Sequence, residues 1–405
     1  MTTAITPAET ATAEASAIDP FSMEFLSDPL PYHEVLREAA PVVRLDAYGV
    51  YAMARYAEVH AALVDWQTFE SGAGVGVANF RMEKPWRAPS LLLEADPPRH
   101  DAPRSVLTKL LSPRALRRLE EHWKTDAVAV VDEVLTRGTE FDAVTDLAEV
   151  FPLRVFPDAV GLGKTGREHL LPYGDFAFNA FGPQNELVTT AAATIGPTMD
   201  WIGVQCQRQN LTTDGIGAQI WAASDRGDIT PAQAPMIVRS LLTAGVDTTV
   251  TGIAAIVNAV ATHPDQWRRL KEDRSLLRVA FEEAVRLESP VQAFFRTATR
   301  DIRVGGVDIA QGEKIMMLLG AANRDPRRWE NPDAFDLSRD PSGHVAFGMG
   351  LHQCVGQHIA RLEALAMLEA LLDRVESIEL TEAPRRHLNN TLRGFEAMPV
   401  RVRMA

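Results

Sequence analysis

A mainly helical protein with a minor β region is the fold class that the sequence predicts. Between Pro103 and Arg296 hydrophobic residues recur almost wholly at helical spacing, and this periodicity breaks at residues 161–166, 181–184 and 225–231. Runs typical of short strands occur before and after this part of the chain. With 405 residues, 46% of them hydrophobic, the chain can bury a large core.

The N-terminal part begins with residues 1–18, which we expect to be disordered. The first 17 residues are rich in Ala, Thr and Glu and contain no Lys or Arg, so they lack the charged and apolar regions of a signal peptide. We expect a single domain over residues 19–405. Its first elements are expected to be a helix at 31–39, strands at 42–45 and 50–55, a helix at 56–63, and a long loop at 71–89.

The C-terminal half is expected to contain two long helices. One covers residues 231–262, where Thr230 and Pro231 form a start signal, and the other runs from Val355 to about Leu372. A Pro-, Arg- and Asp-rich irregular stretch is expected at 324–344. Short strands are expected at 302–307, 314–319, 378–380 and 400–403.

Composition limits the function classes. The net charge of −13 argues against general nucleic-acid binding. No apolar run approaches the ~20 residues that span a bilayer. Two cysteines, Cys206 and Cys354, give no disulfide framework and fit a reducing cytosol. We therefore expect a cytoplasmic protein that binds neither nucleic acid nor membrane, in which Cys206 is structural.

The most informative segment is residues 347–356, which read F-G-M-G-L-H-Q-C-V-G. Cys354 follows a glycine-rich turn and precedes a long helix, whose positive end and free N–H groups favour a thiolate. Glycines let the backbone pass close to a flat group, and Phe347 can cover the sulfur. These are the needs of a thiolate bound axially to haem iron. A buried structural cysteine is the common alternative. A zinc site with His352 and His358 would lack paired ligand clusters.

A second segment, residues 244–249, reads A-G-V-D-T-T inside the helix expected over 231–262. Gly, Asp and two Thr weaken a helix locally, and Thr hydroxyls can bond back to a carbonyl one turn earlier and bend it. Such distortions often mark functional sites, although an exposed polar turn would give the same pattern.

A third segment pairs Glu283 with Arg286 on one helical face. Alone, this spacing carries little information, because ordinary surface helices contain many such pairs.

Together, the three segments resemble the signatures of the cytochrome P-450 monooxygenases. The first matches the family's haem-binding pattern, which here continues into Ala360-Arg361, and the others match its oxygen-activation motif and its ExxR element. The resemblance spans essentially the whole chain after about residue 19. It implies the P-450 fold, with haem b as cofactor and Cys354 as the axial iron ligand beside Phe347 and Gly356.

The resemblance also implies roles for the other two segments. Thr248 hydrogen-bonds the bound oxygen, and Asp247 relays the protons that break the O–O bond heterolytically. Glu283 and Arg286 are structural and support the core on the haem side. Four further residues match the family's positions for holding the haem propionates, although each taken singly reads as a solvated surface cation. They are His100, Arg104, Arg296 and His352.

Electrons have to come from another protein, because the chain has no nucleotide-binding fingerprint and no iron–sulfur cysteine set. The resemblance implies a soluble ferredoxin and its NAD(P)H-dependent reductase. A basic cluster in this acidic chain could steer an acidic ferredoxin, or could be a merely solvated helix face. It consists of Lys109, Arg114, Arg117 and Arg118.

Two sets of residues suggest the substrate class. Polar groups aimed into a haem pocket need a polar partner, and here they are Arg87, Ser90, Arg239, Ser240 and Thr243. A narrow apolar wall is expected from Leu93, Phe178, Phe181, Val291 and Phe294, with Ala244 beside it. Arg, Ser and Thr at one end and aromatic rings toward the iron would suit a small planar carboxylate.

The combination of these polar and apolar pocket residues is similar to that of a bacterial P-450 subfamily. Members of this subfamily oxidise para-substituted benzoates, including the O-demethylation of 4-methoxybenzoate. Thr243 departs from the Ser expected at its position, which keeps the hydroxyl but adds a methyl group. The alternatives are a P-450 for another small hydrophobic substrate and a haem-thiolate binding protein or sensor, which would need no Asp247-Thr248 pair. A peroxygenase typically lacks that acid–alcohol pair as well.

Overall fold

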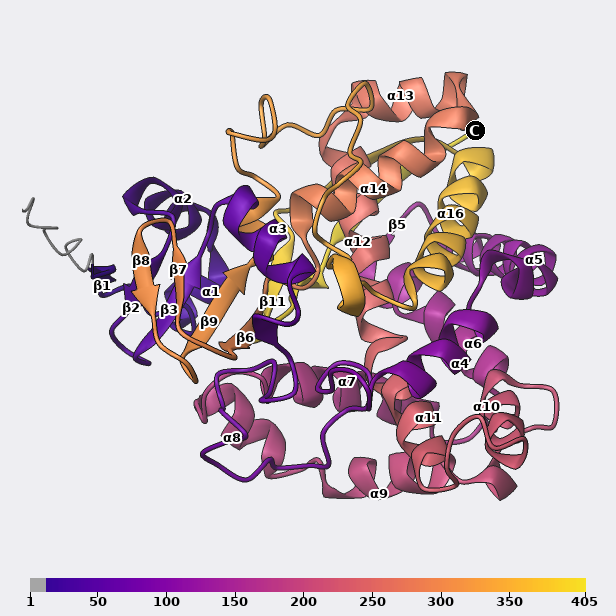
Figure 1. The fold of residues 1–405 in the computed structure, drawn as a ribbon. Coiled ribbons are helices and arrows are strands. Elements are labelled where there is room, and N and C mark those ends of the chain that lie inside the picture. The colour runs from indigo at the N-terminus through magenta and orange to yellow at the C-terminus, as the bar shows by residue number, and fades with distance from the viewer. Residues whose placement is uncertain (1–11) are drawn as a thin grey trace, which may run out of the picture.

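The fold was determined as a computed structural model that describes residues 12–405. A helix-rich part forms the bulk of the molecule, and a smaller part holds the main sheet with the N-terminal helices (Figure 1). This agrees with the mainly helical fold predicted from the periodicity. The helices are α1 Met23–Ser27, α2 Leu30–Ala39, α3 Tyr56–Val64, α4 Asp101–Leu110, α5 Pro113–Arg137, α6 Val150–Val160, α7 Leu170–Asn179, α8 Glu186–Ala192, α9 Gly196–Gln205, α10 Ile216–Asp225, α11 Gln233–Ala244, α12 Asp247–Thr262, α13 Pro264–Glu272, α14 Leu277–Glu288, α15 Leu319–Ala322 and α16 Gln357–Arg374.

The strands form four small sheets. The largest has the order β1-β2-β3-β9-β6-β4, with β10-β13-β5, β11-β12 and β7-β8 making the others. The strands are β1 Glu14–Ser16, β2 Val43–Leu45, β3 Val50–Met53, β4 Phe69–Glu70, β5 Glu140–Asp142, β6 Ala293–Ala298, β7 Ile302–Val304, β8 Val307–Ile309, β9 Lys314–Leu318, β10 Val375–Leu380, β11 Arg385–Leu388, β12 Arg393–Ala397 and β13 Pro399–Met404.

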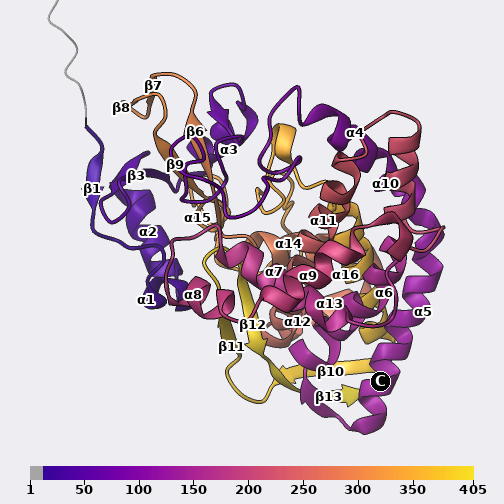
Figure 2. The same ribbon diagram turned by 90° about the horizontal axis from the view of Figure 1, so that it is seen from below.

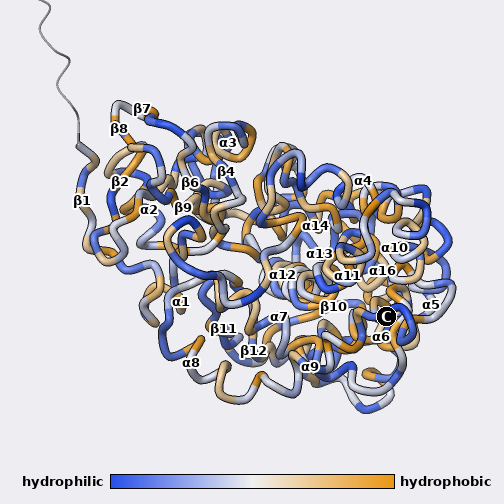
Figure 3. Tube along the Cα trace, turned by 60° about the horizontal axis from the view of Figure 1, so that its bottom comes forward, coloured by the Kyte–Doolittle hydropathy of each residue, from blue (hydrophilic) through white to orange (hydrophobic). Residues whose placement is uncertain are grey.

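The helical core surrounds α12, which is buried along almost its whole length between α14, α16 and the C-terminal strands. Seen from below, α12 lies behind α7 and beside β12 (Figure 2). By length and composition the stretch Gln233–Thr262 could cross a membrane, but 67% of its apolar 18-residue window is buried inside the fold. Its hydrophobicity is therefore that of a core helix. In Figure 3, hydrophobic and hydrophilic residues alternate along the outer elements, as expected of segments with one buried face.

The helix expected over residues 231–262 is two helices. α11 ends at Ala244 and α12 begins at Asp247, with Gly245 and Val246 between them. The break agrees with the predicted distortion, because the Thr248 hydroxyl donates to the Ala244 carbonyl oxygen at 2.7 Å. A side chain at Gly245 would meet the ring of Phe156, so glycine lets the broken helix approach α6.

Order begins earlier than predicted. Residues 1–11 lie outside the described part, but Glu14–Ser16 forms β1, which pairs in parallel with β2. The expectation of disorder up to residue 18 is therefore wrong for this segment. The composition shows no apolar run there because β1 is an edge strand that contributes backbone hydrogen bonds rather than core side chains.

Several other boundaries differ from the prediction. The helical pattern extended to Arg296 ends at Glu288, because β6 begins at Ala293; the strand β5 also lies inside that region. Residues 302–307 form most of the hairpin β7–β8, which turns at two glycines. The helix predicted from Val355 begins at Gln357, and the sheet β11–β12 was missed. The irregular stretch 324–344 and the loop at 71–89 agree with the prediction.

A buried ion pair connects α14 to the irregular stretch. Glu283 and Arg286 are both fully buried, with bidentate hydrogen bonds of 2.7 and 2.9 Å between them. Arg286 also donates to the carbonyl oxygens of Asn323 and Pro332, at 2.7 and 2.8 Å. A second guanidinium, from Arg339, reaches Glu283 at 2.8 Å. The pair therefore satisfies backbone groups that have no sheet or helix to bond them.

Replacing Glu283 by Gln should strongly destabilise the protein, because it leaves two guanidinium groups buried without their counter-charge. The expected loss in the free energy of unfolding is about 3–5 kcal/mol, measured by guanidinium chloride unfolding. Glu140→Gln, which removes the exposed partner of Arg401 on the surface, is the matched control and should leave the unfolding midpoint in place. Equal effects of the two substitutions would contradict a structural role for the buried pair.

Candidate functional site

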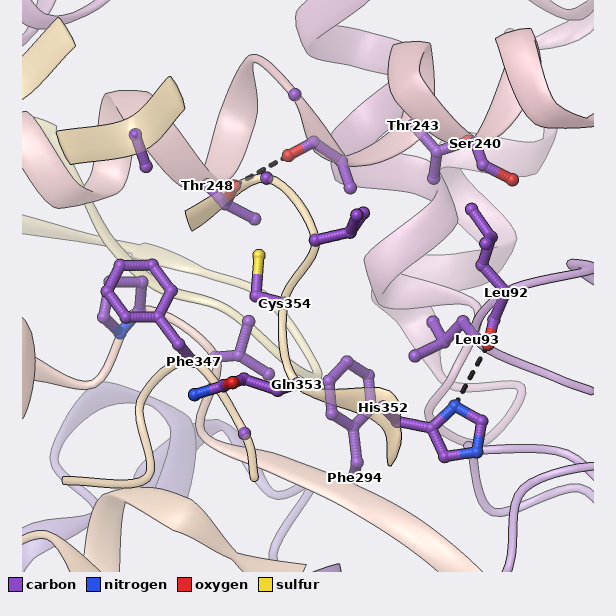
Figure 4. Close-up of a pocket in the computed structure, with 18 of the residues that line it drawn as sticks. Leu92, Leu93, Ser240, Thr243, Thr248, Phe294, Phe347, His352, Gln353 and Cys354 are labelled. Carbon is purple, nitrogen blue, oxygen red and sulfur yellow. Dashed lines mark hydrogen bonds between the residues drawn. The ribbon is translucent and has the colours of Figure 1, made fainter. Parts of the chain in front are cut away.

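A deep cavity lies between the α11–α12 break and the loop that carries Cys354 (Figure 4). Cys354 Sγ points toward the side of the cavity that Thr248 lines, so the sulfur and the broken helix face the same space. All eleven residues predicted to contact the substrate line the cavity, as do five of the six predicted to contact the cofactor. Asp247 and His100 are predicted site residues that do not line it.

The Cys354 loop is shaped by two glycines and closed by one short hydrogen bond. Gly348 and Gly350 have φ values of +65° and +68°, which other residues rarely adopt. The Cys354 N–H then donates to the Phe347 carbonyl oxygen at 2.7 Å. The guanidinium of Arg361 lies over the Phe347 ring at 4.7 Å. The loop thus holds the sulfur at the cavity wall with the aromatic ring beside it.

The sulfur is poised to bind a cation. Burial raises the pKa of the Cys354 thiol, while the N–H groups of Gly356 and Gln357 and the guanidiniums of Arg104 and Arg361 act to lower it. The local donors therefore favour a thiolate that burial alone opposes. A metal ion bound to the sulfur would supply the missing positive charge. Within residues 12–405 no cluster of three His, Cys, Asp or Glu side chains could hold a metal ion.

Buried positive charge without an acidic partner marks one end of the cavity. Arg104 and Arg296 line it, and neither forms an ion pair within residues 12–405. Arg296 is 2% exposed and, among the described residues, bonds only the Phe295 carbonyl oxygen; its burial lowers its pKa to about 10. Two cations facing a buried space call for an anionic ligand.

Two histidines extend this basic end. His352 bonds the Asp96 carboxylate at 2.9 Å and the Leu92 carbonyl oxygen at 3.1 Å. The ring of His100 packs edge-on against it at 4.9 Å, and both His100 ring nitrogens are buried without a hydrogen-bond partner among the described residues. Burial, with the nearby charges of His352 and Arg104, lowers the pKa of His100 to about 4. A ligand with hydrogen-bonding groups at this end would satisfy these orphaned nitrogens.

These features fit a haem. A flat group can lie between the sulfur and the broken helix, and its two carboxylates would meet the unpaired Arg104 and Arg296 beside the unsatisfied His100. No other described part of the cavity pairs a sulfur ligand with unpaired cations in this way.

The opposite end of the cavity is polar, with one surplus positive charge. Arg87 is already neutralised, because its guanidinium bonds the Glu94 carboxylate at 2.8 Å. Arg239 has no acidic partner within residues 12–405 and donates to the Ala88 carbonyl oxygen at 2.8 Å. Burial and the positive charge of Arg87 lower the pKa of Arg239. The hydroxyls of Ser90 and Ser240 lie 3.3 Å apart beside this pair.

Between the two ends stands an aromatic wall. Phe181 packs edge-on against Phe178 and Phe294, with ring centroids 5.8 and 5.9 Å apart. Leu93 and Val291 pack against the same cluster. The predicted apolar contacts therefore form one continuous surface.

Asp247 faces away from the cavity, toward α7 and β11. A methyl group at Gly174 would lie 3.0 Å from the Asp247 Cβ. Burial, together with the nearby Asp175 carboxylate, raises the pKa of Asp247 to about 7, while the charge of His387 acts in the opposite direction. An acid with this pKa can both hold and release a proton at neutral pH.

The predicted basic cluster lies outside the cavity. Its members are exposed on α4 and α5 and form no ion pair among the described residues: Lys109, Arg114, Arg117 and Arg118. Arg104, which lines the cavity, belongs to the same helix as Lys109.

Comparison with known proteins decides the family. The family model described as Cytochrome P450 matches residues 205–395. Cytochrome p450 CYP199A2 of Rhodopseudomonas palustris is 55% identical over 385 residues, which cover 95% of this chain and 93% of the relative. The chain belongs to the cytochrome P450 family. Putative cytochrome P450 126 of Mycobacterium tuberculosis is 31% identical, over 97% of this chain and 99% of its own length.

Solved P450 structures share the fold. Cytochrome P450 CYP108D1 from Novosphingobium aromaticivorans superposes with a TM-score of 0.82 at 29% identity, covering 94% of this chain and 96% of the other. Cytochrome P450 CREJ in complex with (4-ethylphenyl) dihydrogen phosphate gives a TM-score of 0.82 at 26% identity, with 95% and 99% covered. The predicted P-450 fold is therefore confirmed, and the chain is a P450 monooxygenase with haem b as its cofactor.

Sequence reasoning missed residues that act through long-range pairing. Glu94 neutralises Arg87 and also accepts the Ser90 N–H at 2.7 Å. Asp96 holds His352, and Asp175 faces Asp247. No local pattern marks these carboxylates, because their partners are set by the fold.

Replacing Arg296 by Met should weaken haem retention, because it removes a charge-assisted hydrogen bond to a propionate. The expected loss of about 1.5–3 kcal/mol corresponds to roughly ten- to a hundredfold faster haem transfer to an excess of apomyoglobin. The haem-free protein should not lose stability, since it no longer buries an unpaired cation. Arg303→Met, at an exposed arginine on β7, is the control. Haem transfer at the same rate from both variants would contradict the assignment.

Proposed function

We propose that this P450 oxygenates a small aromatic carboxylate at the substituent para to the acid, as in O-demethylation of 4-methoxybenzoate. The single observation that carries the proposal is the one surplus positive charge at the end of the cavity farther from the basic haem end. Arg87 and Arg239 contribute two positive charges and Glu94 one negative charge. A substrate carboxylate would restore neutrality at this end of the cavity.

The Ser90 hydroxyl can donate to a carboxylate at this end, whereas the Ser240 hydroxyl donates to the Met236 carbonyl oxygen at 3.0 Å. Ser90 Oγ accepts the N–H groups of Leu92 and Leu93 at 3.2 and 3.1 Å, so its oxygen is held in place. Its own proton is then free to donate to Ser240 or to a ligand. Thr243 Oγ1 bonds the Arg239 carbonyl oxygen at 2.8 Å, so its methyl group narrows this end. These contacts support recognition of a compact, planar acid.

The aromatic wall supports a flat ring between the carboxylate end and the iron. Phe178, Phe181 and Phe294 line the same cavity as Cys354. A para substituent on a ring held at its acid end would point away from Ser240, toward the Thr248 side. The proposal is supported by the similar solved P450, CREJ, whose structure is a complex with (4-ethylphenyl) dihydrogen phosphate.

The chain's own groups would hold the cofactor and supply protons. Cys354 would bind the iron, with Phe347 and Gly356 beside the ring, and Arg104, Arg296, His100 and His352 would hold the propionates. Haem b supplies the redox chemistry that puts one atom of O2 into the substrate and reduces the other to water. Thr248 would place its hydroxyl in the cavity as a hydrogen-bond donor once it leaves the Ala244 carbonyl oxygen. Asp247 would deliver protons to it.

Electrons would come from a ferredoxin and its NAD(P)H-dependent reductase. Four exposed cations without acidic partners among the described residues suit an acidic ferredoxin, and they stand out in a chain of net charge −13. We place the protein in the cytoplasm, as a single domain whose first strand is β1.

The carboxylate should be needed for binding. 4-Methoxybenzoate should bind roughly ten- to a hundredfold more tightly than 4-methoxybenzamide, because the amide loses a charge-assisted hydrogen bond. The measurement is a titration of the haem spin-state change with each ligand. Ser240→Ala should weaken binding of the acid and leave binding of the amide nearly unchanged.

Val204→Ala, at an exposed position on α9, serves as the matched control for Ser240→Ala. Equal affinity for the acid and the amide, or tight binding of a bulky terpene instead, would refute the carboxylate proposal while leaving the P450 assignment standing.

A further inference from the structure

Asp247 needs a source of protons, and it is separated from the cavity. Within residues 12–405 no hydrogen bond reaches its carboxyl group, although the group is half-buried beside Gly174. The next residue along α7, Asp175, projects from the same turn. The region between α7, α12 and β11 therefore decides how a proton reaches Asp247.

Asp175 is held by three side chains. His387 on β11 bonds its Oδ1 at 2.7 Å, and Asn389 donates to the same oxygen at 2.8 Å. Asn179 donates to the other carboxylate oxygen at 3.2 Å. The imidazole of His387 is 45% exposed, whereas Asp175 is 29% exposed and Asp247 is half-buried. The histidine is thus the most exposed of the three groups.

We propose that His387 and Asp175 form the proton-uptake pair of this enzyme, which carries protons from solvent to Asp247. The proposal rests on the role given above to Asp247. The His387 imidazolium releases its Nε2 proton to Asp175, and solvent returns a proton to the imidazole. Asp175 passes its proton to the Asp247 carboxylate through a solvent molecule, because the two carboxylates share no hydrogen bond. For each proton taken up at His387, Asp247 releases one toward Thr248.

The charges around Asp247 are arranged for this exchange. Facing it are Asp175 from α7, Glu149 from the start of α6, and His387, which itself lies near Glu396. The hydrogen bond to Asp175 raises the pKa of His387, so the imidazole carries a proton over more of the neutral range. Burial, together with the charge of Asp175, raises the pKa of Asp247 to about 7, and the charge of His387 opposes this rise. The charges of His387 and Asp175 therefore act on Asp247 in opposite directions.

His387 and Asp175 shift the pKa of Asp247 in opposite directions. This difference gives a test whose result would not be expected if the two residues only packed against α12. His387→Gln removes a positive charge, so the pKa of Asp247 should rise above about 7. Asp175→Asn removes a negative charge, so the same pKa should fall. The carboxylic-acid C=O stretch of Asp247, identified in the holoenzyme by its absence from Asp247→Asn, can be titrated by infrared difference spectroscopy. The midpoints of the two variants should move in opposite directions from that of the unchanged protein.

Turnover should slow as well. With 4-methoxybenzoate and a ferredoxin–reductase pair, His387→Ala should lower the rate of product formation roughly tenfold and raise the solvent deuterium isotope effect. The matched control is His122→Ala on α5, an exposed histidine that also pairs with an aspartate, at 3.3 Å. It should show neither the slower turnover nor the larger isotope effect.

Each outcome decides between the two proposals. If Asp247→Asn slows turnover but the His387 and Asp175 variants keep the unchanged rate, isotope effect and infrared midpoint, this uptake route is wrong and the role of Asp247 stands. If Asp247→Asn is also without effect, both are wrong. Infrared midpoints that move in the same direction in the two variants would equally overturn the route, and they need neither substrate nor redox partner.

Discussion

The buried Glu283–Arg286 pair is the interaction on which the geometry of the site depends. Arg286 bonds the Asn323 carbonyl oxygen, and the Asn323 side-chain oxygen accepts the Val345 N–H at 2.7 Å. Val345 in turn begins the loop that carries Cys354, through the Gly348 N–H bond to its carbonyl oxygen at 2.9 Å. Two residues with no contact to the cavity thus set where the sulfur stands. Because the two side chains are fully buried and hydrogen-bonded to each other, the pair holds a fixed position in the core.

The cavity contains more positive charge than the protein neutralises. Arg104 and Arg296 at one end and Arg239 at the other have no acidic partners within residues 12–405, and their desolvation opposes folding. Ligands supply the missing negative charge: two propionates at the first end and, in our proposal, one substrate carboxylate at the second. Ligand binding should therefore stabilise the fold, since the haem and the substrate would bind the folded state. The two ends also differ in their surplus positive charge, so we expect them to bind different anionic groups.

The sequence predicted the parts of the site that depend on local chemistry. The turn before Cys354 needs its glycines, and the Thr hydroxyls that bend the pocket helix bond within their own helix, so both can be read from neighbouring residues. Glu94 could not be predicted as the partner of Arg87, nor Asp175 as the neighbour of Asp247, because the fold brings these groups together. The strands β1, β5, β11 and β12 were missed for a related reason: short edge strands have too few alternating residues to show a period. Asp247 was predicted to act with Thr248 at the cavity. Adjacent residues on a helix point in different directions, so the Asp247 side chain faces away from the cavity that Thr248 lines.

The central claim is that Cys354 binds haem iron as a thiolate. The most direct test is the absorption spectrum of the purified, reduced, carbon monoxide-bound protein, recorded beside that of Cys354→His. The account predicts a strongly red-shifted Soret band for the unchanged protein and its loss in the variant, because imidazole donates less electron density to iron than thiolate does. A Soret band at the position typical of histidine-bound haem in the unchanged protein, or a red-shifted band that survives the substitution, would contradict it.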